Sequence, residues 1–346
     1  MIKSKQKIER IFKNVTSHKN IHEGILFIES KNGEFKFSKG YGGKTIDTPI
    51  VIASITKLFT TVCIIKLIEN KKLSLNSKVS DYLNNEYLNS LHIYKCHDYS
   101  FDLTIYDLLF QTSGLPDIYE AKNNSLKSRA IEKDIYVSFK EIINEVKLLP
   151  SRFAPGKHNK KAYYADVNFD ILGVIIEKVL SVPLAQAFFD FIIEPLNLKN
   201  TYLPVSEKDL VPYIYYNDMA LYRPNFIKSC YSSGGCISTV NDLMIFIKSF
   251  FTGKLFNQTL LTELSTYRNL QLSMYPIRYG GGYMQIELGG ISTLFLGNGE
   301  LLGHSGSTGS FAFYYPDKEL FFVGDFNQIS DASIPIRFVM KLAMFI

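Results

Sequence analysis

Strand-like segments occur near both ends of this chain, whereas helical patterns dominate its middle, and this distribution restricts the possible folds most strongly. Near the start, Asn32-Gly33 separates two strand-like apolar runs, which is a strong signal for a β-hairpin. Three further strand-like segments lie near the end of the chain: 282–288, 311–315 and 320–326. A sheet built from both ends requires the chain to leave it and return. We therefore expect a discontinuous sheet domain, residues 1–56 and 230–346, with a mostly helical domain, residues 57–229, inserted into it.

Apolar residues at helical spacing predict several helices. The clearest cover residues 3–14, 55–70, 170–180, 241–250 and about 335 to the end. The second of these is strongly apolar, because Leu58, Val62 and Ile65 recur three or four positions apart among mostly uncharged neighbours. We expect this helix to be largely buried.

The composition of the 346 residues is typical of a globular protein. Hydrophobic residues make up 46% and charged residues 21%, so a packed core can form. Basic residues outnumber acidic ones, 38 to 33, but they are scattered, whereas a nucleic-acid-binding protein gathers them on one face. We therefore expect no nucleic-acid partner, and a weak preference at most for anionic small substrates.

The sequence carries no recognisable targeting or membrane-spanning segment. Its first residues are charged and lack the apolar stretch of a secretory signal. No apolar run approaches the roughly 18 residues that a membrane helix needs. We expect a cytoplasmic protein without a membrane span, or an extracytoplasmic one if a leader has been removed.

The four cysteines give no sign of a metal centre. Cys63, Cys96, Cys230 and Cys236 form no C-x-x-C pair and show no zinc-ligand spacing with the histidines. We expect free thiols that are buried or partly buried, and we expect neither a metal nor an organic cofactor.

The segment Ser54-Ile55-Thr56-Lys57 is the first candidate for chemistry. If Ser54 begins the apolar helix, Lys57 projects from the same face three residues later. Its amine can then take the serine proton, provided that burial or a nearby positive charge lowers the pKa of Lys57. Ser4 and Lys7 repeat this spacing in a charged segment, so the S-x-x-K pattern alone is weak, and a capping serine beside a solvated lysine is the usual alternative. The burial expected for the helix after Ser54 distinguishes the two.

Later blocks in the same order strengthen this interpretation. They are the stretch 103–116 (LTIYDLLFQTSGLP), Pro155-Gly156, Tyr164-Ala165-Asp166 followed by the apolar run up to Glu177, the stretch 234–242 and Gly303-His304-Ser305-Gly306. Together with Ser54 and Lys57 they resemble the class C β-lactamase and D-alanyl-D-alanine carboxypeptidase family, which includes esterases and D-amino-acid peptidases. The resemblance extends from about residue 40 to about residue 327.

The resemblance implies a fold and a set of roles. The fold is α+β of the β-lactamase/transpeptidase type, an antiparallel sheet flanked by terminal helices with the helical domain inserted. Ser54 is implied as the nucleophile, Lys57 as its base or proton relay, and Tyr164 as a proton shuttle to the leaving group. His304 falls at a position that is often lysine, close to the substrate carboxylate. The substrate is a D-amino-acid peptide, an ester or a β-lactam.

Further residues are implied as substrate contacts. The backbone N–H groups of Ser54 and Ser307 form the implied oxyanion hole, and Ser305 and Asp166 are expected to contact the substrate. The walls of the pocket are expected to come from loops such as 117–128 and 213–230.

Three departures from the family pattern affect the expected function. Gln111 occupies a position that is usually histidine in the family, Asp166 one that is usually asparagine, and His304 one that is often lysine. A histidine with its ordinary pKa of about 6.5 is mostly neutral at pH 7, which favours a peptidase or esterase over an efficient β-lactamase. Asp166 is equally compatible with a helix cap at Val167. The alternative function is a protein that binds or senses β-lactams or peptidoglycan fragments without turning them over.

Overall fold

The computed structural model describes residues 2–121, 124–290, 293 and 297–346. Its central element is an eight-stranded sheet in the order β2-β1-β14-β13-β12-β11-β10-β9, with every neighbouring pair antiparallel. The strands are β1 Gly24–Ser30, β2 Lys36–Tyr41, β9 Arg268–Asn269, β10 Ile277–Tyr279, β11 Met284–Glu287, β12 Glu300–Ser305, β13 Phe311–Tyr315 and β14 Leu320–Asp325. Residues from both ends of the chain therefore form one sheet.

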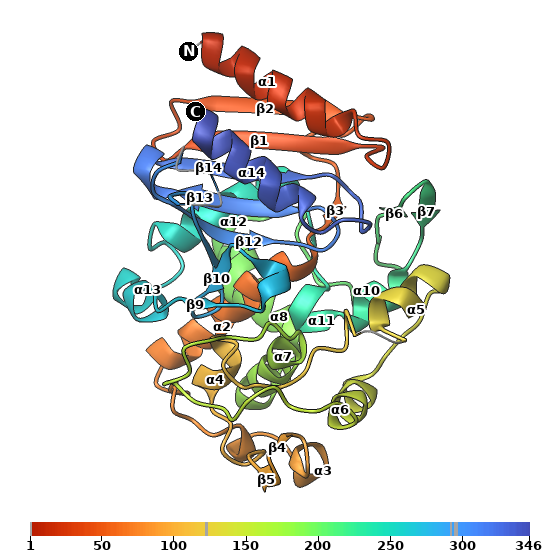
Figure 1. The fold of residues 1–346 in the computed structure, drawn as a ribbon, viewed down its shortest axis with the longest axis vertical. Helices are drawn as coiled ribbons and strands as arrows, with labels where there is room; N and C mark the ends of the chain where they lie inside the picture. The colour runs from red at the N-terminus through yellow and green to blue at the C-terminus, as the bar shows by residue number, and fades with distance from the viewer. Residues whose placement is uncertain (1, 122–123, 291–292, 294–296) are drawn as a thin grey trace.

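Helices cover both faces of this sheet (Figure 1). The terminal helices α1 (Ile2–Thr16) and α14 (Ile334–Phe345) pack together, and α14 lies against β12 and β13. Helix α12 (Val240–Phe251) packs against β1, β13 and β14. Strand β14 has covered faces on both sides, and all six of its residues are buried.

The helical part of the molecule lies at one edge of the sheet, around the neighbouring helices α2 (Thr56–Glu69) and α7 (Val167–Leu180). Both helices are strongly buried, as the apolar pattern of α2 predicts. The other α-helices are α3 Asn85–Leu88, α4 Ile105–Leu109, α5 Leu126–Glu132, α6 Phe139–Lys147, α8 Leu184–Phe188, α9 Glu194–Leu196, α10 Pro224–Ser229, α11 Tyr231–Gly234 and α13 Gln258–Leu264.

Short elements connect these parts. The pairs β3 (Ile50–Val51) with β8 (Ile237–Ser238), β4 (Ile93–Tyr94) with β5 (His97–Asp98), and β6 (Ile214–Tyr216) with β7 (Met219–Leu221) form two-stranded ribbons. One-turn 3₁₀ helices are η1 Ala53–Ile55, η2 Val79–Asp81, η4 Leu272–Met274 and η6 Pro316–Lys318, and η3 Phe189–Ile193 is a π-helical turn.

The predicted fold class, an antiparallel sheet flanked by the terminal helices with helices inserted, is confirmed. The five predicted helices are present with ends that shift by a few residues, and β13 has the predicted bounds. Strands β9, β10 and β12 were not predicted; β12 is polar and glycine-containing, and β9 and β10 are only two and three residues long.

Two negative observations apply to the described ranges. No single helix there is long and apolar enough to cross a bilayer; α7 and the segment Leu184–Leu196 satisfy length and composition only as a pair bent by 84°. No group of three or more His, Cys, Asp or Glu side chains in these ranges is arranged to hold a metal ion. The four thiols are free, but Cys96 is exposed, because it lies in the turn between β4 and β5 and not in the core.

Candidate active site

A sharp turn between β3 and α2 presents Ser54. Ala53 has a left-handed backbone with φ = +44°, a conformation that costs an alanine roughly 1–2 kcal/mol. Two hydroxyls from the turn after β12 hold the preceding carbonyls: Thr308 Oγ1 donates to the Val51 oxygen at 2.7 Å and Ser310 Oγ to the Ile52 oxygen at 2.9 Å. The turn after β12 therefore stabilises the strained segment that presents the serine.

Gly306 makes this contact between the two segments possible. A Cβ atom at this position would lie 2.2 Å from Ser310 Oγ and 2.6 Å from the Ile52 oxygen. Only glycine therefore lets the end of β12 approach the serine turn, which brings Ser307 beside Ser54; both residues line the same cavities.

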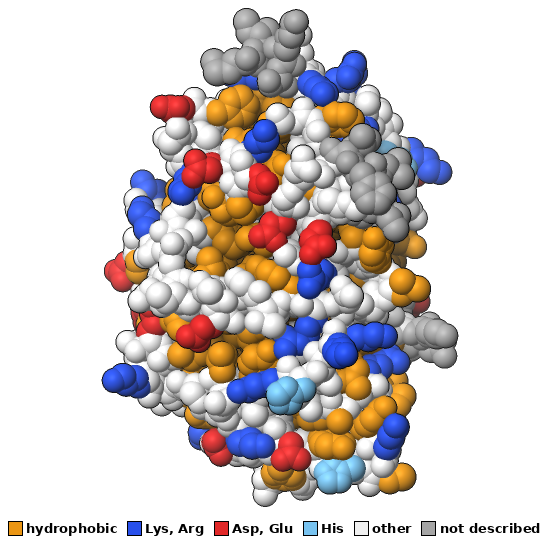
Figure 2. Space-filling model, turned by 60° about the vertical axis from the view of Figure 1, so that its left-hand side comes forward, with side chains coloured by type: hydrophobic (Ala, Val, Ile, Leu, Met, Phe, Trp, Pro, Cys, Tyr) orange, Lys and Arg blue, Asp and Glu red, His pale blue; other side chains and the backbone are white. Residues whose placement is uncertain are grey.

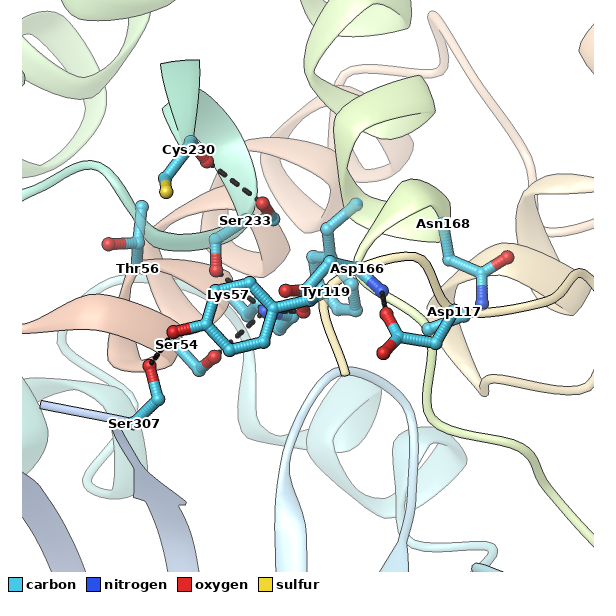
Figure 3. A network of polar contacts seen from close by, with 12 residues as sticks. Ser54, Thr56, Lys57, Asp117, Tyr119, Asp166, Asn168, Cys230, Ser233 and Ser307 are labelled. Carbon is cyan, nitrogen blue, oxygen red and sulfur yellow. Dashed lines mark hydrogen bonds and ion pairs between the residues drawn. The ribbon is translucent and has the colours of Figure 1, made fainter. Parts of the chain in front are cut away.

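Lys57 is fully buried, and its ammonium is surrounded by acceptors. Its Nζ lies 3.1 Å from Ser54 Oγ, 2.6 Å from the Ser233 carbonyl oxygen and 2.7 Å from Asp166 Oδ1 (Figure 3). The ammonium donates hydrogen bonds to the serine oxygen and to the carbonyl, and the carboxylate adds an ion pair. The lysine is thus fixed in position and touches the serine oxygen directly.

The Ser233 carbonyl reaches Lys57 because α11 is wedged between α2 and α7. Thr60 Oγ1 donates to the Ser232 oxygen at 2.7 Å, and Ser232 Oγ donates to the Phe169 oxygen at 2.9 Å. A Cβ atom at Gly173 would lie 2.3 Å from Ser232 Oγ, so the small residue on α7 is required for this packing.

Asp166 stands at the first turn of α7 but does not cap it. It occupies the N-cap position with an αR backbone, and its side chain makes no capping hydrogen bond. The carboxylate instead forms the ion pair with Lys57. The sequence left two roles open for Asp166, a helix cap and a member of the active site, and the structure favours the second.

Tyr164 is positioned through its neighbours by Gln111, the residue that departs from the family's histidine. The Gln111 carbonyl accepts from Tyr163 N–H at 2.9 Å, and its Oε1 accepts from Ala165 N–H at 3.0 Å. Burial and the Asp166 charge raise the pKa of Tyr164 well above its ordinary value, while a hydrogen bond with Ser54 acts in the opposite direction. The phenol is therefore a proton donor at neutral pH, not a phenolate.

Two more carboxyl groups lie near this ion pair. Burial, then the charge of Asp166, raises the pKa of Asp117 to about 7. The same two causes raise the pKa of Asp170 to about 8. These two carboxyl groups therefore hold extra protons near neutrality.

His304 lies behind the site wall and not in the cavity. Its ring is fully buried, Nδ1 lies 2.8 Å from the Ser305 oxygen, and Nε2 lies 3.5 Å from the hydroxyl of buried Tyr279. Burial and the charge of Lys57 lower the pKa of His304 to about 3. The imidazole is therefore neutral, as expected, but the expected position beside a substrate carboxylate is corrected: its ring packs against Tyr164 and Tyr279.

The other predicted contacts face the cavity. Ser305 and Ser307 line it together with Ser54, Tyr164 and Asp166. Ser305 Oγ contacts the sulfur of Met284 at 3.9 Å, whereas Ser307 Oγ lies 3.1 Å from the hydroxyl of Tyr119. The structure thus brings Ser54, Lys57, Tyr164, Asp166, Ser305 and Ser307 together, and leaves His304 behind them.

Two hollows meet at Ser54. The large cavity, about 450 Å³, is lined among others by Asp117, Glu120, Arg152, Tyr163, Met274 and Tyr275. The small chamber, about 30 Å³, is lined mainly by Ala53, Ala130, Ile214, Phe226, Ile227 and Cys230. The expected wall loop 117–128 contributes to both hollows, and the expected wall loop 213–230 contributes to the small chamber.

Sequence reasoning missed Gln111 and Ser233 as members of the site, and it gave Asp117 and Tyr119 no role of their own within the expected wall loop 117–128. Asp117 directly follows the Gly114-Leu115-Pro116 block, so its place in the sequence offered a signal. Ser233 acts through its carbonyl oxygen, and no side-chain pattern identifies such a group.

The family model of the β-lactamases matches residues 12–332 of this sequence, nearly its whole length. The chain belongs to the β-lactamase family. Membership agrees with the ordered blocks around Ser54, Tyr164 and His304, and with the sheet and helices that bring them together.

Individual relatives in this family are distant. Teichoic acid D-alanine hydrolase of Staphylococcus aureus is 28% identical over 302 residues, which cover 83% of this chain and 66% of that protein. Protein flp of Staphylococcus aureus is 31% identical over 214 residues, 57% of this chain and 38% of that protein. The chain thus spans less than two thirds of either relative.

A solved structure confirms the fold over nearly the full chain. The D-amino acid amidase of Ochrobactrum anthropi superimposes with a TM-score of 0.77 at 18% identity, covering 97% of this chain and 98% of the amidase. At this identity the likeness concerns the fold.

Proposed function

We propose that this protein is a serine hydrolase that cleaves an ester or amide through an acyl-enzyme on Ser54. The observation that carries the proposal is the contact between the fully buried Lys57 amine and Ser54 Oγ at 3.1 Å, with Tyr164 lining the same cavity as the serine. A solvated lysine beside a capping serine makes no such contact.

The reaction follows in two balanced steps. In the form of the site in which the Lys57–Tyr164 pair has lost one proton, Ser54 Oγ attacks the substrate carbonyl and the pair takes the serine proton. The pair then gives this proton to the leaving group as the carbon–heteroatom bond breaks. Water then attacks the acyl-enzyme, giving the carboxylic acid and free Ser54. The N–H groups of Ser54 and Ser307 are the proposed donors to the oxyanion, where losing one donor typically costs roughly 10²–10³ in rate.

The substrate class we propose is a D-amino-acid peptide, amide or ester, in preference to a β-lactam. Buried, neutral His304 supplies no positive charge for the β-lactam carboxylate, and Asp117, Glu120 and Asp166 line the large cavity beside Ser54. Asp166 also lines the small chamber, so on both sides of Ser54 a carboxylate is placed to favour an ammonium group, such as that of an amino acid. The similarity to a teichoic acid D-alanine hydrolase and to a D-amino acid amidase points the same way.

A three-substrate panel tests the proposal: a D-alanine p-nitroanilide, a p-nitrophenyl ester and nitrocefin. Continued release of product that disappears in Ser54→Ala supports a hydrolase. Ser4→Ala is the matched control, because it alters the other S-x-x-K segment on α1. One equivalent of product followed by no further release supports the sensor instead, and activity that survives in Ser54→Ala contradicts both.

A further inference from the structure

The two hollows at Ser54 differ in size and character. The small chamber holds about 30 Å³ and has many apolar side chains in its walls besides the charged Lys127 and Asp166. The large cavity holds about 450 Å³ and carries Asp117, Glu120 and Arg152 as well as Asp166. One water-sized atom needs about 10–15 Å³ by this kind of measure, so the chamber accommodates two or three. A substrate bound across Ser54 must place one side of its scissile bond in each hollow.

The position of Tyr164 indicates which side of the scissile bond lies in which hollow. It lines the large cavity and is not among the residues that line the small chamber. Because the leaving group must receive its proton from the Lys57–Tyr164 pair under the proposed function, the leaving group lies in the large cavity. The side chain of the acyl group then lies in the small chamber.

Tyr119 forms the partition between the hollows. It lines both of them, as do Ser54, Asp166 and Ser307. Figure 3 shows its hydroxyl directed to Ser307. That hydroxyl lies 3.1 Å from Ser307 Oγ, and its ring stacks on Phe226 of the chamber wall with centroids 6.3 Å apart.

The backbone of Tyr119 is also fixed. Its carbonyl accepts from the N–H of Lys127 at 3.2 Å, and the side chains of Glu120 and Lys127 form an ion pair at 3.2 Å. The first turn of α5 therefore holds the loop that carries the ring.

We propose that Tyr119 determines acyl specificity, by closing the small chamber so that it admits acyl groups whose chain beyond the carbonyl carbon has at most about three non-hydrogen atoms. The inference rests on the proposed function. Acetyl, glycyl and alanyl groups fit this limit, and longer acyl chains do not, while the leaving group in the large cavity can be considerably larger.

A series of p-nitrophenyl esters tests the assignment, because the leaving group stays constant while the acyl chain grows. For the wild type, kcat/KM for the acetate should exceed that for the hexanoate at least about tenfold, since misfit of single methylenes costs about 10-fold or more. Tyr119→Ala opens the partition and should raise the hexanoate/acetate ratio at least about tenfold. Tyr119→Phe keeps the ring and should leave the ratio within about threefold.

Two further variants separate the possible causes. Phe226→Leu enlarges the chamber from another wall and should raise the ratio even if Tyr119→Ala folds poorly. Met274→Ala changes only the large cavity and should leave the ratio unaltered. An unchanged ratio in both Tyr119→Ala and Phe226→Leu, with Ser54-dependent turnover retained, overturns the chamber assignment alone. Absence of Ser54-dependent turnover of every ester overturns the proposed function and this inference with it.

Discussion

Lys57 Nζ forms an ion pair with Asp166 Oδ1 at 2.7 Å while it contacts Ser54 Oγ at 3.1 Å. The amine that contacts the nucleophile is therefore itself held by a carboxylate, at a position where the family pattern has asparagine. The charge of Asp166 thus acts directly on the amine beside the serine.

Activity should rise with pH as the Lys57–Tyr164 pair loses a proton. Asp166→Asn should shift this rising limb of the kcat/KM profile to lower pH, by about one unit. The charge of Asp166 raises the pKa of Tyr164, so an uncharged amide lowers it again and the Lys57–Tyr164 pair loses its proton more easily. A pH profile of both proteins on one ester measures the shift. Because coupled groups titrate together, the shift belongs to the pair. A limb that stays in place or moves upward would mean that Asp166 does not control this transfer.

Tyr164→Phe should lower kcat about 100-fold and change the melting temperature little. The phenol is held neutral, and loss of a positioned proton donor costs about 10²–10⁴ in rate. Tyr163→Phe is the matched control, because Tyr163 lines the same large cavity and its ring stacks under Arg152. Steady-state kinetics on an ester decide the matter, and equal losses in both variants would assign Tyr164 a merely structural role.

Asp170→Asn should stabilise the protein increasingly as pH rises. The folded-state pKa of Asp170 is raised to about 8, so between about pH 4 and pH 8 the folded protein holds a proton that the unfolded chain has released. Stability of the wild type therefore falls through this window, by up to about 1.4 kcal/mol per pH unit, whereas the amide has no such dependence. Urea unfolding at pH 5 and pH 8 measures the difference. A constant gap between the two proteins would show that Asp170 does not titrate abnormally.

Nitrocefin should be turned over at least about tenfold less efficiently than a p-nitrophenyl ester or a D-alanine anilide. Neutral His304 cannot hold the β-lactam carboxylate, and Asp117 and Asp166 repel it from the large cavity. Comparison of kcat/KM values under one set of conditions tests this order. A preference for nitrocefin would show that another group, such as Arg152, binds the carboxylate.

The pair Ser54 and Lys57 was predictable because a spacing of three on an apolar helix places both side chains on one buried face. The sheet was predictable where its strands are apolar, as in β1, β13 and β14. Strand β12 was not predicted, because its own residues are not typical of a strand. It is a strand because it pairs with β11 and β13.

The burial of His304 depends on contacts between distant segments. Its ring lies against Tyr279 of β10, a three-residue strand that was not predicted, so the sequence could not reveal that the ring is buried and its pKa lowered to about 3. The choice between cap and ion pair for Asp166 likewise depends on where Lys57 lies relative to α7, which sequence spacing does not specify.

Intact-mass spectrometry after treatment with a fluorophosphonate probe tests the central claim most directly, because it detects the covalent bond to the nucleophile. The account predicts one adduct per chain, located on Ser54 by peptide mapping, present in Ser4→Ala and absent in Ser54→Ala. An adduct that persists in Ser54→Ala, or an unmodified wild type, would contradict it.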